Sequence, residues 1–147
     1  MGRLIFPNRA RAYLDANILI HVIEGHPILM AAIESLVQLI ESQHLIVATS
    51  ELSLVELLAK PLSVGNLGLA AEYEAMLSTN PELSVLPISR SILIEGAKLR
   101  GRLSLRTPDA LHVATAAMFD STYFVTEDRR IRVPDGIQLI RLKEFAE

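Results

Sequence analysis

The run Leu45-Ile46-Val47-Ala48, apolar at every position, lies between two helical segments and constrains the fold most. A strand without polar alternation is typical of a parallel sheet, because helices cover both of its faces. Apolar residues recur at helical spacing over residues 28–42 before the run, and Ser50 after it is a favoured helix-capping residue. The sequence therefore predicts a parallel sheet that is covered by helices.

The rest of the chain repeats this alternation of strands and helices. Further strands are expected at residues 12–15, 83–88, 122–126 and 138–140. Further helices are expected over residues 17–25, from Ser50 to a stop at Pro61, from the end of a loop at 62–68 to residue 78, over 90–102, from Thr107-Pro108 onward, and in a short C-terminal turn. This order indicates an α/β sandwich with a mostly parallel sheet, formed by one domain over residues 1–147.

Composition excludes several classes of site. The chain has no cysteine, so disulfides, thiolate metal sites and cysteine nucleophiles are ruled out. The four histidines, His21, His26, His44 and His112, lack the spacing of a structural zinc site. The net charge of −3 argues against a globally basic nucleic-acid binder, although a local basic rim remains compatible with it. No run reaches 18 apolar residues, so we expect no membrane span and a cytoplasmic location.

Asp15 stands out because it follows a strand and lies in the apolar stretch Tyr13–Ile20, which contains no lysine or arginine. Burying an unpaired charge costs several kcal/mol or more, so such a carboxylate is normally paired, neutralised or bound to a cation. Two interpretations are open at this point. Asp15 caps the helix that follows, or it shares a cation with other carboxylates.

Other acids fall where a parallel sheet could bring them near Asp15. Glu127 and Asp128 directly follow the strand at 122–126, and sites in such sheets form at the carboxyl ends of strands. Two mostly apolar helices each carry a narrow polar stripe with one acid. The stripes are Ser53, Glu56 and Lys60 on one helix, and Asp109, His112 and Thr115 on the other.

Each of these positions also has an ordinary structural interpretation. The two stripes would simply face solvent, as in most amphipathic helices. Asp109 in a first helical turn is stabilised by the helix dipole, and His112 would be an ordinary hydrogen-bonded residue. Asp128 would end a strand beside a solvated run of arginines.

Together the acids would form a site made of oxygen ligands. Neighbouring carboxylates raise one another's pKa unless a cation neutralises them, and all-oxygen sites suit Mg²⁺ or Mn²⁺ rather than zinc. Such a cation can orient and deprotonate an attacking water and stabilise a leaving oxygen. This chemistry fits phosphodiester hydrolysis, but also a phosphatase or a purely structural magnesium site.

Four segments taken together resemble the PIN-domain ribonucleases, and most of all the VapC toxins of bacterial type II toxin–antitoxin systems. They are Leu14–Ile20, Ser53–Glu56, Thr107–Ala116 and Phe124–Arg130, in that order. The similarity runs from about residue 12 to residue 142, and Thr107–Ala116 is its most specific part.

The resemblance implies a three-layer α/β/α sandwich and an endoribonuclease that depends on Mg²⁺ or Mn²⁺. It implies that the substrate is tRNA or another structured RNA, that the protein inhibits translation and growth as the toxin of its module, that it forms a homodimer, and that a VapB-type antitoxin neutralises it. The catalytic and metal-binding acids would be Asp15, Glu56, Asp109 and Asp128. Asp15 and Asp109 are expected to be direct ligands, and the other two to act directly or through water.

The same resemblance suggests supporting residues. Asn17 and Thr126 match positions that support the acids by hydrogen bonding, and His112 is a further supporting candidate. Glu127 departs from the family pattern, in which a neutral residue is common, and it would share the metal or make the site more acidic. Candidates for RNA contact are Arg106, Arg129 and Arg130, with Arg100, Arg102 and Arg132 as further basic residues; the alternative is that these charges are merely solvated.

Two other functions compete with a nuclease. The first is a PIN-like module that binds RNA or protein without cutting, although the intact acids argue against it. The second is a phospho-receiver domain, which also has a small acidic magnesium pocket. A receiver needs paired acids after its first strand and an acceptor aspartate after a central one, and Ile88-Ser89-Arg90 supplies none.

Overall fold

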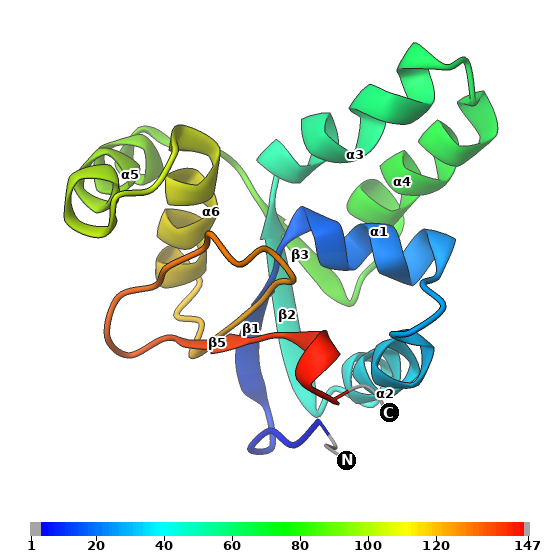
Figure 1. Ribbon diagram of the computed structural model, residues 1–147, viewed down its shortest axis with the longest axis horizontal. Coiled ribbons are helices and arrows are strands. Elements are labelled where there is room, and N and C mark those ends of the chain that lie inside the picture. Colours follow the sequence, from blue (N-terminus) through cyan, green and yellow to red (C-terminus); the bar gives the residue numbers. More distant parts are fainter. Residues whose placement is uncertain (1–3, 146–147) are drawn as a thin grey trace.

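The computed structural model, which describes residues 4–145, contains a five-stranded sheet with the order β3-β2-β1-β4-β5 (Figure 1). Every neighbouring pair is parallel. The strands are β1 (Ala10–Leu14), β2 (Leu45–Ser50), β3 (Leu83–Leu86), β4 (Tyr123–Val125) and β5 (Gln138–Ile140). The predicted parallel α/β sandwich is confirmed.

Helices cover both faces of the sheet, which gives three layers (Figure 1). One face carries α1 to α4, and the other carries α5 and α6. Their bounds are α1 (Ala16–Glu24), α2 (Met30–Glu41), α3 (Leu52–Ser63), α4 (Leu67–Thr79), α5 (Arg90–Leu103) and α6 (Thr107–Met118), with a final 3₁₀ turn, η1 (Leu142–Phe145). No helix within the described range is long and apolar enough to cross a bilayer.

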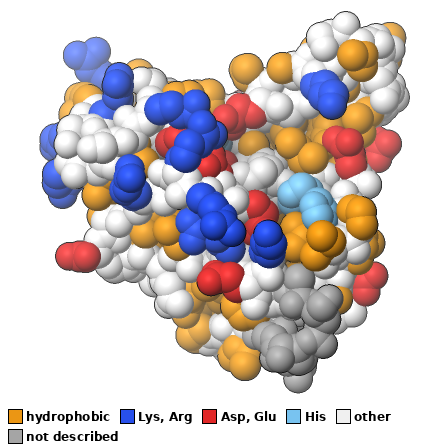
Figure 2. Space-filling model, in the orientation of Figure 1, with side chains coloured by type: hydrophobic (Ala, Val, Ile, Leu, Met, Phe, Trp, Pro, Cys, Tyr) orange, Lys and Arg blue, Asp and Glu red, His pale blue; other side chains and the backbone are white. Residues whose placement is uncertain are grey.

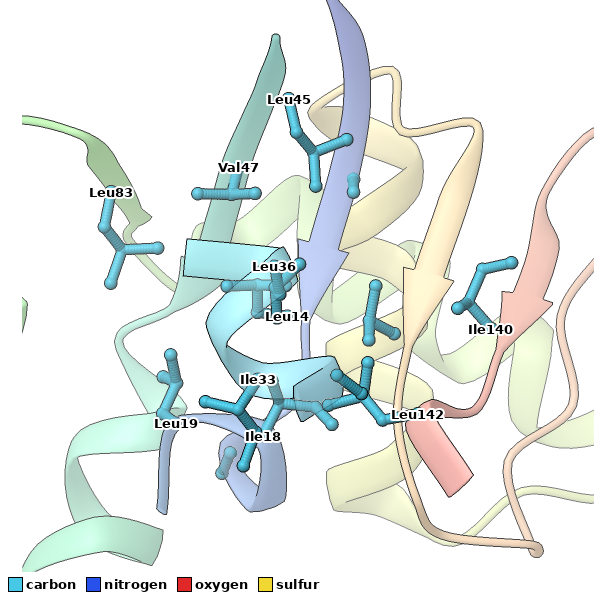
Figure 3. Packing of buried hydrophobic residues seen from close by; sticks show 14 of the residues in the cluster. Leu14, Ile18, Leu19, Ile33, Leu36, Leu45, Val47, Leu83, Ile140 and Leu142 are labelled. Carbon is cyan, nitrogen blue, oxygen red and sulfur yellow. The ribbon is translucent and has the colours of Figure 1, made fainter. Parts of the chain in front are cut away.

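The alternation of side chains along β1 divides the core in two. Ala12 and Leu14 point into the larger apolar cluster, which contains buried residues of α1 and α2 such as Ile18 and Leu36 (Figure 3). Tyr13 points to the opposite face and packs in the cluster formed with α5 and α6. Because successive strand residues face opposite sides, a central strand that is buried on both faces has to be apolar throughout.

The strand order reverses beside Asp15. From β1 the chain runs to β2 and β3 on one side and returns to β4 on the other side. In open parallel sheets, ligands bind at the carboxyl ends of the strands where the order reverses in this way. The N–H of Asp15 donates to the carbonyl of Val125 (3.0 Å), so the ends of β1 and β4 are joined directly at this point.

Strand β1, helix α2 and strand β4 differ from their predicted bounds by one or two residues. Two further boundaries that differ lie at prolines. Helix α3 does not stop at Pro61 but continues to Ser63, so the buried proline removes its own N–H donor from the last turn without ending the helix. The loop expected at 62–68 is correspondingly short, since Asn66 already caps α4. Strand β3 ends at Leu86, before Pro87, which has no N–H to donate to a neighbouring strand.

Candidate metal and catalytic site

Asp15 caps helix α1 and is almost completely buried. Its Oδ1 accepts a hydrogen bond from the N–H of Ala16 (2.9 Å). Its Oδ2 accepts one from Asn17 Nδ2 (3.1 Å) and one from Thr126 Oγ1 (2.7 Å). Within residues 4–145, no lysine or arginine lies within ion-pair distance of this carboxylate. Capping therefore describes the local role of Asp15, but it leaves the buried charge without a lysine or arginine partner in this part of the chain.

His112 lies against Asp15 and links two further residues of the site. Its Nε2 is 2.6 Å from Glu56 Oε1 and 3.8 Å from Asp15 Oδ1. Its Nδ1 is 2.5 Å from the hydroxyl of Tyr13. One ligand atom each from Asp15, Glu56 and His112 lie within 4.8 Å of one another, so β1, α3 and α6 converge on one point.

The polar stripe of α6 does not face solvent. Asp109, His112 and Thr115 are all buried, and His112 is only 1% exposed. The solvent-facing interpretation is therefore wrong for this helix, because α6 packs this side against the sheet. On α3 the stripe is divided: Ser53 is buried and hydrogen-bonds to Thr49 (2.7 Å), whereas the Glu56 side chain is about one-third exposed.

Burial and charge shift the ionisation of these groups. Burial raises the pKa of Asp15, although the charge of His112 and the hydrogen bond from Thr126 oppose this shift. Burial lowers the pKa of His112, but the hydrogen bond to Glu56 and the neighbouring Asp15 charge outweigh it and leave that pKa raised. A pocket that disfavours the ionised form of Asp15 is one in which a bound cation would be strongly stabilising.

Asp109 and Asp128 lie outside the tight group. Asp109 is buried one turn before His112 on α6, and its Oδ2 accepts a hydrogen bond from Arg106 Nε (3.4 Å). Asp128 is tied to Arg130, which donates to it from Nε (3.1 Å), from Nη2 (3.0 Å) and from the backbone. These hydrogen bonds hold the pKa of the Asp128 carboxyl below its usual range.

The supporting residues separate into two groups. Asn17 and Thr126 hydrogen-bond to Asp15 and to each other (3.1 Å), so they fix the orientation of its carboxylate. Glu127 has a different environment. Its two carboxylate oxygens accept the backbone N–H groups of Leu142 (2.7 Å) and Lys143 (3.1 Å), so its contacts fasten η1 to the end of β4.

Tyr13 is the residue that sequence reasoning missed. It is fully buried, and its hydroxyl holds the ring of His112 from the side opposite Glu56. The available signal was its position two residues before Asp15. Residues at this spacing point to the same face of a strand, so a polar hydroxyl there is directed toward the same helix as the carboxylate.

The group that converges contains two carboxylates and one imidazole, which are residue types that bind divalent cations. The family model of the PIN domain matches residues 12–137, which is most of the chain. The chain belongs to the PIN domain family. No curated protein sequence gives a significant match.

Solved structures share this PIN fold over nearly its whole length. A chain of the DNA-bound VapBC complex from Salmonella typhimurium is 23% identical, with a TM-score of 0.69 over 90% of this chain and 98% of the other. One from Rickettsia felis VapBC2, bound to a DNA fragment of its promoter, is 20% identical, with a TM-score of 0.67 over 89% and 98%. One from VapBC-5 of Mycobacterium tuberculosis is 22% identical, with a TM-score of 0.60 over 90% and 98%. At these identities the likeness concerns the fold.

Proposed function

We propose that this PIN domain is an endoribonuclease that depends on Mg²⁺ or Mn²⁺ and cleaves phosphodiester bonds of tRNA or another structured RNA. The observation that supports it most is the approach of Asp15, Glu56 and His112 to within 4.8 Å of one another, where Asp15 follows the carboxyl end of β1. Asp15 is a buried carboxylate that has no lysine or arginine partner within residues 4–145, and in the PIN domain family we explain it as a cation ligand.

In this proposal Asp15 and Asp109 hold the cation directly, and Glu56 and Asp128 complete the site directly or through water. A bound divalent ion would supply activation of water and stabilisation of the leaving oxygen. Asn17 and Thr126 keep the Asp15 carboxylate in one orientation through their hydrogen bonds. Asp128 has to exchange at least part of its contact with Arg130 before it can join the site.

Purified protein tests the reaction. The wild type is expected to cut RNA when Mg²⁺ or Mn²⁺ is present and to lose this activity in EDTA. Asp15→Asn and Asp109→Asn are expected to cut no RNA with either Mg²⁺ or Mn²⁺, while they keep a cooperative thermal transition. Cleavage by either folded variant at the wild-type rate would contradict the assignment of the acids.

We further propose that the protein acts in the cytoplasm as the toxin of a toxin–antitoxin module, as a homodimer that a VapB-type antitoxin neutralises. The likeness to chains of VapBC complexes supports this role. Induced expression of the wild type is expected to stop translation and growth, and Asp15→Asn is expected to prevent the arrest. Sustained growth with intact, soluble wild-type protein would argue against a toxin.

A non-catalytic binding module is the second candidate. The ion pairs of Asp128 with Arg130 and of Asp109 with Arg106 favour it, since two of the four acids are then engaged by arginines. Such a module would bind RNA equally well in the wild type and in Asp15→Asn, and would leave the RNA uncut in Mn²⁺. The cleavage assay therefore separates the two candidates.

A further inference from the structure

A cavity of about 480 Å³ lies between the segment that follows β4 and the segment that follows β5. Its volume falls in the range of small-ligand sites. The lining side chains are three basic and two acidic residues: Arg129, Arg141, Lys143, Glu127 and Glu144. Figure 2 shows basic side chains in the middle of the surface that faces the viewer, over the segment after β4 and beside the C-terminal turn.

The charges of this cavity are not balanced internally. The carboxylate of Glu127 accepts hydrogen bonds from the backbone N–H groups at the start of η1. Over residues 4–145, no carboxylate forms an ion pair with Arg129, Arg141 or Lys143. The Nε of Arg141 is buried and has no hydrogen-bond partner in this described part of the chain. The three basic and two acidic side chains leave the cavity lining with a net positive charge, which suits an anion with several oxygens.

The cavity and Asp15 lie on the same edge of the sheet. Val125 pairs with Ile140 in the register of β4 and β5, so Arg141 follows β5 beside Thr126. The hydroxyl of Thr126 in turn donates to Asp15. Neighbouring strands are about 4.8 Å apart, which puts Arg141 and Asp15 roughly two strand spacings, or about 10 Å, from each other.

We propose that this cavity binds a phosphate of the RNA strand that flanks the phosphate to be cleaved. This inference rests on the proposed ribonuclease function and adds the place where the substrate backbone is held. The planar guanidinium of Arg141 matches two phosphate oxygens, and Lys143 supplies a compact positive charge. Because these contacts reach only the backbone, they position RNA without selecting its sequence.

Binding can be measured apart from cleavage in an Asp109→Asn background, with fluorescein-labelled bulk tRNA and Mg²⁺ present. Adding Arg141→Gln or Lys143→Gln is expected to weaken binding about tenfold. Each substitution is also expected to reduce the magnitude of the slope of log K against log salt concentration by about one, where K is the association constant for tRNA. The matched control is Arg9→Gln, which removes the same charge from an exposed residue that precedes β1, at the opposite edge of the sheet. It is expected to change binding less than twofold.

Thermal unfolding identifies any variant that fails to fold. If Arg141→Gln does not fold, Lys143→Gln alone provides the binding test, because Lys143 is exposed. Unchanged binding by a folded Arg141→Gln and Lys143→Gln, or no tRNA binding by the parent, would overturn the phosphate site. If wild-type protein still cleaves RNA in that case, the proposed function stands without it. Weakened binding in both variants, with no cleavage by the wild type, would keep the site and remove the catalytic function.

Discussion

His112 Nε2 lies 2.6 Å from Glu56 Oε1, while Nδ1 of the same ring is held by Tyr13 at 2.5 Å. The ring is 1% exposed, so its contact with Tyr13 is shielded from bulk water. Glu56 is therefore fixed by a buried neighbour, although its own side chain is partly exposed. This makes His112 a positioning residue for a carboxylate that is proposed to complete a metal site.

Changing His112 to Leu is expected to lower Mn²⁺ affinity about tenfold, since outer partners of metal ligands typically contribute 10–100-fold. His112→Gln, whose amide can still donate to Glu56, is expected to retain most of the affinity. Isothermal titration calorimetry with Mn²⁺ measures both. Equal affinities in the two variants would show that the contact with Glu56 does not matter for the cation.

Metal-free protein is expected to become less stable as the pH rises above neutrality. The pKa of His112 is raised above its ordinary value of 6.5, mainly by Glu56 and Asp15, which together outweigh the effect of burial. The stability from the charged ring is thus fully present below about pH 6.5 and is lost as the pH passes through the raised folded-state pKa. Urea titrations in EDTA from pH 6 to 9 measure this, and a parallel curve for His112→Leu would contradict it.

Glu127→Gln is expected to affect stability rather than metal binding. The substitution leaves one acceptor for the two N–H groups of Leu142 and Lys143, at a cost of about 1–2 kcal/mol. Mn²⁺ affinity is expected to stay within twofold of the wild type, in contrast to Asp15→Asn. A tenfold loss of Mn²⁺ affinity in Glu127→Gln would return this residue to the metal site.

Tyr73→Phe tests the contact between helices α4 and α1. The hydroxyl of Tyr73 on α4 donates to the carboxylate of Glu24 at the end of α1. Loss of a hydrogen bond to a charged acceptor is expected to cost about 1.5 kcal/mol, which corresponds to a decrease in Tm of about 5 °C for a chain of this size. Tyr123→Phe is the control, because the Tyr123 hydroxyl has no hydrogen bond within residues 4–145. A Tm equal to that of the control would mean that the bond adds nothing.

The order of strands and helices could be predicted because the spacing of apolar residues in each segment indicates which of the two it forms. The continuous hydrophobicity of β2 predicted helices on both faces, and the structure has them. The boundaries near Pro61 and Pro87 were less predictable, because one proline is tolerated within a last helical turn and the other ends a strand. Whether a proline ends an element depends on how its ring packs in the fold, which the sequence does not specify.

The candidate site could be predicted only in part. Asp15 and Glu56 meet as the topology of a parallel sheet suggested. The sequence could not show that the polar stripe of α6 is buried, because a line of Asp, His and Thr is equally suited to water. Nor could it show that Glu127 bonds to η1, since this contact joins residues 15 positions apart.

Sequencing the ends of tRNA fragments after incubation with purified protein in Mn²⁺ tests the metal-dependent nuclease most directly. Wild type is expected to produce discrete new ends that are absent in EDTA and absent with Asp15→Asn. Identical ends from wild type and from folded Asp15→Asn, or no ends beyond the protein-free background with wild type, would contradict a ribonuclease whose cation is held by Asp15.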